Sequence, residues 1–333
     1  MKAARLTAVG GPQHLRIEEV PVPAVRENEV LVRVKAAALN HRDVYITQGL
    51  YPNIHVPVTL GSDGAGEIAA LGAVFSDLAV GDAVVIDPML DWGDDPQVWD
   101  AERSGLLGMP SDGTWAEYVV VAAENVYPKP ASLSMEEAAA IPLAGLTAYR
   151  AVFTRGAVRR GETVLIPGIG GGVQTFALLF AKHAGARVVV TSSSDEKLEH
   201  AKALGADLAI NYASAPQWAK DLRKVGPFDL VVDSSGGDTL RAAIDLVRPG
   251  GRIVIYGGTR GESTIKLFPL FWKHVTVMGT SMGSPQDFAA MLKLFESDLR
   301  PVVDRVFALD DVVAAAQRLD EARQFGKVVL QIR

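Results

Sequence analysis

A run of glycines between two apolar segments constrains the fold of this chain more than any other feature. Residues 168–173 read GIGGGV and follow the apolar stretch 163–166, which is typical of a buried strand. Apolar residues then recur at helical spacing as far as Gly185, and a second apolar run follows at 187–191. Strand, glycine turn, helix and strand form the βαβ unit that holds a dinucleotide pyrophosphate, because glycines let the backbone approach the phosphates. A tight turn in some other α/β protein is the alternative.

The rhythm of the chain predicts an α/β fold with two domains. The first 125 residues read as short strands broken by turns, with strands expected at 30–35, 83–86 and 118–121. From about residue 145, strands alternate with helical patterns. These later strands are predicted at 163–166, 187–191, 208–211, 230–233, 252–256 and 275–279. Six parallel strands with crossover helices make a doubly wound sheet.

The C-terminal tail predicts how the domains are assembled along the chain. From about Pro285 it contains two amphipathic helices, and it ends in a strand at 327–332 that should return to pair with the N-terminal domain. We therefore expect a β domain from residues 1–125 and 288–333. The dinucleotide-binding domain should comprise residues 126–287.

Composition limits the expected cellular compartment and the classes of binding partner. The chain of 333 residues has a net charge of −6 and no basic tract, which argues against nucleic acid as a partner. No stretch approaches the roughly 18–20 apolar residues that span a membrane. The N-terminus leads into charged residues, so we expect a cytoplasmic protein that is neither secreted nor bound to a membrane.

The absence of cysteine limits the available chemistry. With no cysteine, the chain has no disulfide, no thiolate nucleophile and no cysteine-ligated zinc. The six histidines are scattered, and no pair has the short spacing of a helical or hairpin metal site. We expect no metal, with a long-range site of carboxylates and histidines as the alternative.

Four further motifs carry a resemblance to a known family. They are GDAV at 81–84, GTWAEY at 113–118, LAGLTAY at 143–149 and GKVV at 326–329. In their order and spacing, together with the glycine turn, they resemble the medium-chain dehydrogenase/reductase superfamily across essentially the whole chain. The resemblance implies a GroES-like β domain joined to a Rossmann domain, and a homodimer or homotetramer.

Within that superfamily the chain resembles the zinc-free quinone oxidoreductase branch. The zinc-dependent alcohol dehydrogenases hold a catalytic metal on two cysteines and a histidine, where this chain has Asn40, Ser62 and Ala144. Asp63 stands where the zinc enzymes often have glutamate. The loop 87–113 lacks the four cysteines of a structural zinc, and segments 39–43 and 49–52 resemble the active-site segment of the zinc-free branch.

The end of the second strand of the βαβ unit favours NADP(H) over NAD(H). Ser192 stands where NAD-selective sites have an acid, and Ser193, Ser194 and Lys197 follow it. Hydroxyls and an ammonium can hold a 2′-phosphate that an acid would repel. Asp195 complicates this interpretation, and Ser193 with Glu196 also has the spacing of a helix capping box.

The full set of predicted cofactor-binding residues includes positions taken from the resemblance. Tyr212 resembles a residue that often lies against the 2′-phosphate, and Thr147 one that contacts the nicotinamide. Gln174 replaces the last glycine of the family's phosphate turn. The set is Thr147, Gly168, Gly170, Gly171, Gly172, Val173, Ser192, Ser193, Ser194, Lys197 and Tyr212.

Without a metal, hydrogen-bond donors must stabilise charge on the substrate oxygen. This suits quinones and α,β-unsaturated carbonyls, whose charge is delocalised. By resemblance the candidate donors are Asn40, Tyr45 and Tyr51; for each tyrosine the alternative is a ring packed in the core with its hydroxyl hydrogen-bonded there. Arg42 and Asp43 are expected to form structural pairs.

Two basic residues, His41 and Lys327, leave alternatives open. His41 is either a proton shuttle or an ordinary histidine. Lys327 is either catalytic or, as we favour, an anchor for the last strand.

The predicted function is therefore NADPH-dependent, zinc-free reduction of a small quinone or enone. One alternative is a 2-enoyl thioester reductase, which would need a long groove and a basic patch for a carrier phosphate. The other is a protein that binds NADPH without turnover.

Overall fold

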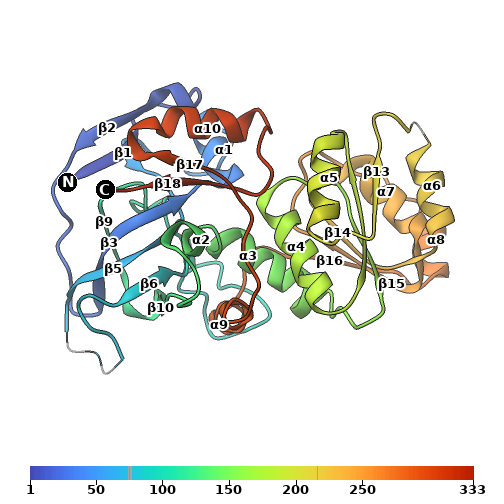
Figure 1. Cartoon of the computed structure of the whole chain (residues 1–333), viewed down its shortest axis with the longest axis horizontal. Coiled ribbons are helices and arrows are strands. Elements are labelled where there is room, and N and C mark those ends of the chain that lie inside the picture. The colour runs from blue at the N-terminus through green and yellow to red at the C-terminus, as the bar shows by residue number, and fades with distance from the viewer. Residues whose placement is uncertain (74, 76, 216) are drawn as a thin grey trace. The chain divides into compact units, whose positions relative to one another are not determined.

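The computed structural model describes residues 1–73, 75, 77–215 and 217–333, which form two compact units. The first unit comprises Met1–Leu146 and Gly283–Arg333, and the second comprises Thr147–Met282 (Figure 1). Residues 126–146 thus lie in the first unit, whereas the sequence-based division assigned them to the dinucleotide-binding domain. The reason is that β10 (Val126–Pro128) pairs with β6 (Ala83–Ile86), and α2 (Met135–Ala139) packs against the strands of the first unit.

The first unit is built on β-strands. Its largest sheet has the order β10-β6-β5-β3-β18-β17, with β9 also paired to β3, and a three-stranded sheet has the order β2-β1-β4. The strands not yet bounded are β1 (Lys2–Leu6), β2 (Leu15–Glu19), β3 (Glu29–Ala38), β4 (Val58–Thr59), β5 (Asp63–Leu71), β7 (Met89–Leu90), β8 (Gly105–Leu106), β9 (Tyr118–Ala122), β17 (Val303–Ala308) and β18 (Lys327–Gln331). Its other helices are α1 (His41–Gln48), α9 (Pro285–Leu294) and α10 (Val312–Asp320).

The register of three strands sets the position of the polar residues discussed below. Strand β18 pairs antiparallel with β3, with Val329 opposite Ala38, which confirms that the last strand returns to the N-terminal region. Strand β5 pairs with the other edge of β3, with Asp63 opposite the same Ala38. The end of β3 therefore lies between the beginnings of β5 and β18.

The second unit is a six-stranded parallel sheet, which confirms the predicted doubly wound topology. Its order is β13-β12-β11-β14-β15-β16, so strands are added toward one edge from β11 to β13 and toward the other edge from β14 to β16. The strands are β11 (Thr163–Ile166), β12 (Arg187–Ser192), β13 (Leu208–Asn211), β14 (Phe228–Asp233), β15 (Val247–Ile255) and β16 (Thr276–Gly279). The helices are α4 (Gly172–His183), α5 (Asp195–Ala203), α6 (Trp218–Val225), α7 (Gly237–Leu246) and α8 (Leu267–Trp272), while α3 (Pro142–Tyr149) contains the boundary between the units.

Burial in the second unit follows the pattern of a parallel sheet covered on both faces. Five consecutive residues of β12, from Val188 to Ser192, are buried, since helices pack on both sides of such a sheet. Helix α8 departs from this pattern. Its apolar side chains Leu267, Phe268, Phe271 and Trp272 are all more than half exposed.

Among the residues that the structure describes, no helix combines the length and apolar character needed to cross a lipid bilayer.

Candidate functional site

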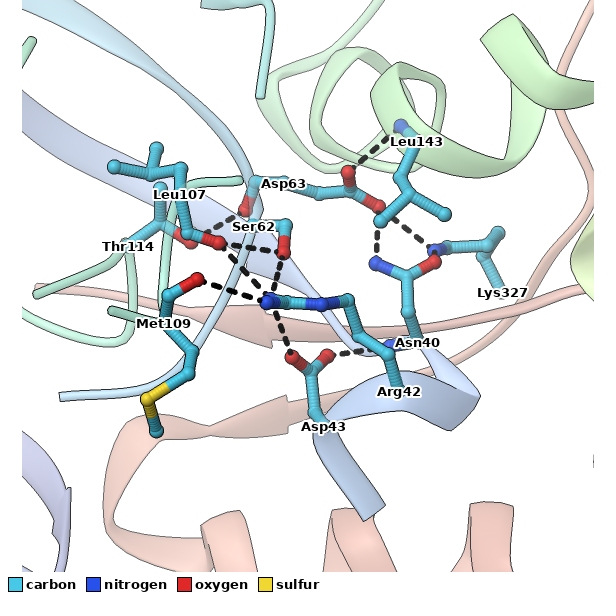
Figure 2. Close-up of polar contacts among 10 residues, drawn as sticks. All are labelled: Asn40, Arg42, Asp43, Ser62, Asp63, Leu107, Met109, Thr114, Leu143 and Lys327. Carbon is cyan, nitrogen blue, oxygen red and sulfur yellow. Dashed lines mark hydrogen bonds and ion pairs between the residues drawn. The ribbon is translucent and has the colours of Figure 1, made fainter. Parts of the chain in front are cut away.

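A buried polar cluster lies where β3, β5 and β18 meet. Lys327 is 3% exposed, Asn40 7% and Asp63 0%, although Lys327 and Asn40 are 287 residues apart in the sequence. The ammonium Nζ of Lys327 donates to Asn40 Oδ1 at 2.6 Å and to Asp63 Oδ2 at 2.8 Å, and Asn40 Nδ2 donates to the same Asp63 oxygen at 2.9 Å (Figure 2). The three side chains form a closed ring of charge-assisted hydrogen bonds.

Asp63 is also tied to the surrounding backbone. Its Oδ1 accepts from the N–H of Leu143 at 2.8 Å, and its main-chain carbonyl accepts from the hydroxyl of Thr114 at 2.7 Å (Figure 2). Both carboxylate oxygens are therefore occupied. The side chain has little freedom to rotate.

A second buried ion pair lies next to this ring at the beginning of α1. Arg42 Nη1 donates to Ser62 Oγ at 2.8 Å and to the carbonyl of Leu107 at 3.0 Å, and Nη2 donates to the carbonyl of Met109 at 3.2 Å. Asp43 Oδ1 lies 3.9 Å from Arg42 Nη1, which confirms the expected structural pairing (Figure 2). Burial raises the pKa of Asp43 to about 6, opposed by the guanidinium of Arg42 and the N–H of Asn40.

The predicted catalytic residues Asn40, Tyr45 and Tyr51 all belong to the first unit. Only Asn40 belongs to the buried ring. The Tyr51 ring packs against the guanidinium of Arg42, whose Cζ lies 5.0 Å from the ring centroid. Tyr45 is half-buried, and its ring centroid lies 6.4 Å from that of His41. Their predicted roles as donors stay predictions.

The positions compared with zinc ligands carry poor donors for zinc. Asn40 is engaged in the ring, the Ser62 hydroxyl donates to the carbonyl of Leu107 at 2.8 Å, and Ala144 is apolar. Within the described residues, no group of three or more histidine, cysteine, aspartate or glutamate side chains could hold a metal ion.

In the second unit, the glycine turn follows β11, next to the point between β11 and β14 where the strand order switches from one side of the sheet to the other. Gly170 has φ +144°, and an ideal Cβ there would lie 2.8 Å from Lys197 Cδ and 3.2 Å from Lys197 Nζ. The Lys197 side chain therefore runs along the turn. Helix α4 begins after Gly171 with no side-chain cap, so its first N–H groups are available to a phosphate. These features fit the pyrophosphate of a dinucleotide.

The serines after β12 adopt a different local structure from the capping box expected at Ser193. The N-cap of α5 is Ser194, whose hydroxyl accepts from the N–H of Lys197 at 3.3 Å, and Ser192 Oγ accepts from the N–H of Ser194. Ser193 is left exposed. Asp195 Oδ1 accepts from Asn211 Nδ2 at 2.7 Å, which holds its carboxylate toward the end of β13.

Sequence reasoning missed Arg260. This exposed residue follows β15, and its Cζ lies 5.4 Å from the ring centroid of Tyr212, which follows β13. The loop carrying Arg260 is fixed by a hydrogen bond from its N–H to the carbonyl of Ser235 at 2.8 Å. A cation therefore stands beside the tyrosine that the sequence assigned to the 2′-phosphate. No local motif marks Arg260, because only the fold brings these loops together.

Two further positions discussed from the sequence, Thr147 and Gln174, also lie in the second unit. Thr147 is buried in α3, and its predicted contact with nicotinamide stays a prediction. Gln174 turns toward the end of β14, where its Nε2 donates to Ser234 Oγ at 2.9 Å. The predicted site residues thus fall into two groups, one in each unit.

Comparison with known proteins identifies the two parts separately. Residues 26–131 match the alcohol dehydrogenase GroES-like domain, and residues 172–297 match the family described as zinc-binding dehydrogenase. The predicted GroES-like character of the β domain is thereby confirmed.

Individual relatives extend over the whole chain. A zinc-type alcohol dehydrogenase-like protein of Schizosaccharomyces pombe is 39% identical, with 97% of each chain covered. A quinone oxidoreductase of Pseudomonas aeruginosa is 32% identical, with 99% of each chain covered. A solved structure of an NAD-dependent alcohol dehydrogenase has a TM-score of 0.94 at 40% identity, with both chains fully covered. The chain belongs to the medium-chain dehydrogenase/reductase superfamily of nicotinamide-dependent oxidoreductases.

Proposed function

We propose that this protein is an NADPH-dependent oxidoreductase that transfers hydride to small quinones or α,β-unsaturated carbonyls without a catalytic zinc ion. The observation that carries the proposal is the pair of buried cations beside the positions compared with zinc ligands. Lys327 Nζ lies 2.6 Å from Asn40 Oδ1, and Arg42 Nη1 lies 2.8 Å from Ser62 Oγ.

Charge balance supports a centre that works without a dication. The buried cations Lys327 and Arg42 are matched by the buried carboxylates Asp63 and Asp43. A Zn²⁺ ion bound here would add two uncompensated positive charges in a poorly solvated place. Uncompensated buried charge is strongly unfavourable. Zinc would also need Asn40 and Ser62 to give up their present hydrogen bonds.

The residues of the first unit can stabilise an oxyanion with neutral donors. When bound, reduced nicotinamide supplies the hydride. Asn40 Nδ2–H donates to the substrate oxygen on which negative charge develops, and the phenols of Tyr45 and Tyr51 are further donors able to release a proton. Reduction is complete when the substrate has gained one hydride and one proton. Quinones and enones suit this arrangement, because conjugation spreads the charge before the proton arrives.

The residues around Tyr212 favour NADP(H) over NAD(H). Arg260 supplies a cation beside the Tyr212 ring, Lys197 supplies a second cation along the glycine turn, and Ser193 supplies an exposed hydroxyl. The carboxylate of Asp195, which Asn211 holds at the end of β13 next to Tyr212, opposes this preference, but the two cations outnumber it. The charges therefore complement a phosphate on the adenosine ribose.

The test is steady-state oxidation of NADPH with benzoquinone, naphthoquinone, a panel of enals and an enoyl thioester. The reverse assay uses simple alcohols with NADP⁺ and NAD⁺. We expect turnover with quinones or enals and none with alcohols. Faster turnover of the thioester would indicate the enoyl thioester reductase instead. NADPH binding with no turnover of any compound would identify a binding protein, and zinc-dependent alcohol oxidation would refute the proposal.

A further inference from the structure

The Asn40–Asp63–Lys327 ring determines which way the Asn40 amide points. An ammonium can only donate and an ionised carboxylate can only accept. Asn40 Oδ1 must therefore face Lys327, and Nδ2 must face Asp63. The distances agree: Oδ1 lies 2.6 Å from Lys327 Nζ, and Nδ2 lies 2.9 Å from Asp63 Oδ2. Rotating the amide by a half-turn would set N–H groups against the ammonium and an oxygen against the carboxylate.

The ring also leaves donors unused. The contacts of the described residues occupy one of the two N–H groups of Asn40 Nδ2 and two of the three N–H groups of Lys327. Both oxygens of Asp63 already accept hydrogen bonds, Oδ2 from Lys327 and Asn40 and Oδ1 from the N–H of Leu143. The unused N–H groups of Asn40 and Lys327 can therefore donate to the oxygen of a substrate.

The ammonium of Lys327 makes the N–H groups of Asn40 stronger hydrogen-bond donors. A cation bonded to an amide oxygen draws electron density toward that oxygen and leaves the amide N–H groups more positive. Hydrogen bonds in such chains strengthen one another. The effect is greatest where water is excluded, and all three side chains here are buried.

We propose that Lys327 is a positioning residue for the reaction, which acts through Asn40. It fixes the orientation of the amide and polarises it, so that the free Nδ2–H of Asn40 is a strong donor to the developing oxyanion. The inference rests on the proposed function, in which Asn40 contacts the substrate oxygen. It goes beyond an anchoring role for Lys327, which would require only a bond to Asp63.

The kinetic test removes the charged pair together, so that no buried charge is left alone. Lys327→Met with Asp63→Asn should lower kcat by about 10- to 100-fold, which is less than the roughly 10²- to 10³-fold cost of removing a whole oxyanion donor. The Kd of NADPH, measured by fluorescence titration, should stay within about twofold of wild type. The matched control is Lys35→Met with Glu67→Gln, which removes the ion pair at 3.4 Å between half-exposed side chains of β3 and β5. We expect no change in kcat for the control.

Lys327→Arg keeps the positive charge and should have a kcat between that of the wild type and that of the neutral variant, Lys327→Met with Asp63→Asn. A kcat of the neutral variant within twofold of wild type would overturn the inference. It would equally be overturned if the loss lay in KM alone, or if Lys327→Arg gave no recovery while remaining folded.

A second readout does not depend on turnover and so separates this inference from the proposed function. In ¹⁵N–¹H spectra of the wild-type protein, the two Nδ2 protons of Asn40 should exchange slowly with solvent, because the amide is buried and held between Lys327 and Asp63. The assignment comes from the loss of this pair of resonances in Asn40→Ser. Solvent exchange of both protons should be faster in the variant that carries Lys327→Met with Asp63→Asn. Rapid solvent exchange of both protons in the wild type would refute the positioning role, even if that variant does not fold or no substrate is turned over.

Discussion

Selection of NADPH over NADH should depend on two cations that come from different loops. Lys197 lies along the glycine turn, and Arg260 lies beside the ring of Tyr212. A charge pair at about 4 Å is worth about 1 kcal/mol in water and about 4 kcal/mol near a protein surface. Because Arg260 is exposed and Lys197 only partly buried, we expect about 1–2 kcal/mol for each cation.

That magnitude predicts the result of replacing each cation. Lys197→Ala and Arg260→Ala should each raise the Kd of NADPH by about 5- to 30-fold. The Kd of NADH should change less than about threefold, since NADH has no 2′-phosphate. Both constants are measured by nucleotide fluorescence titration at about 0.05 M salt, and the difference should shrink at about 0.5 M because ions screen exposed charges.

A lysine on the same helix provides the control. Lys202 lies near the other end of α5, paired with Glu199 at 2.7 Å. Lys202→Ala should leave both constants unchanged. Equal losses for NADPH and NADH in the Lys197 and Arg260 variants would refute the assignment of these cations to the 2′-phosphate.

Three further outcomes follow from single positions. Gly170→Ala should weaken NADPH and NADH alike by roughly 5- to 100-fold in titrations, because φ of +144° is strained for alanine and the methyl group would displace the Lys197 side chain from the turn; unchanged affinity would contradict this. Burial raises the pKa of Asp87 to about 8, so the proton is held in the folded state and lost first from the unfolded state. The free energy of unfolding should therefore fall by ~1.4 kcal/mol per pH unit between about pH 4 and 8 through this group alone, and denaturant curves of Asp87→Asn should lack that slope. Phe271, exposed on α8, is expected to be covered by a second copy of the chain, so Phe271→Lys should lower the mass seen in sedimentation, and an unchanged mass would count against this contact.

Periodicity was sufficient to predict most of the fold. Strands β11 and β13 have the bounds expected from their apolar runs, and the return of β18 to β3 follows from the terminal position of that run. Helix phase was harder to predict. The first turn of α5 begins one residue later than the expected capping box, because Ser192 still pairs with Asn211 as part of β12.

The parts of the candidate site that could not be predicted depend on register and on loop paths. Nothing in the sequence near Lys327 indicates Asn40, since their contact requires Val329 of β18 to lie opposite Ala38 of β3. Nothing near Arg260 indicates Tyr212, since the loops after β15 and β13 must converge. Both contacts join segments that are distant in sequence, and they carry much of the proposed chemistry.

The most direct test of a metal-independent reaction is to measure zinc content and quinone or enal turnover on the same sample. Purified protein dialysed against a chelator, then against metal-free buffer, is assayed by elemental analysis and by NADPH oxidation. The charge balance of Lys327, Arg42, Asp63 and Asp43 predicts far less than one zinc per chain, full activity, and no gain when zinc is added back. One zinc per chain, with activity lost on its removal and restored on its return, would contradict the account.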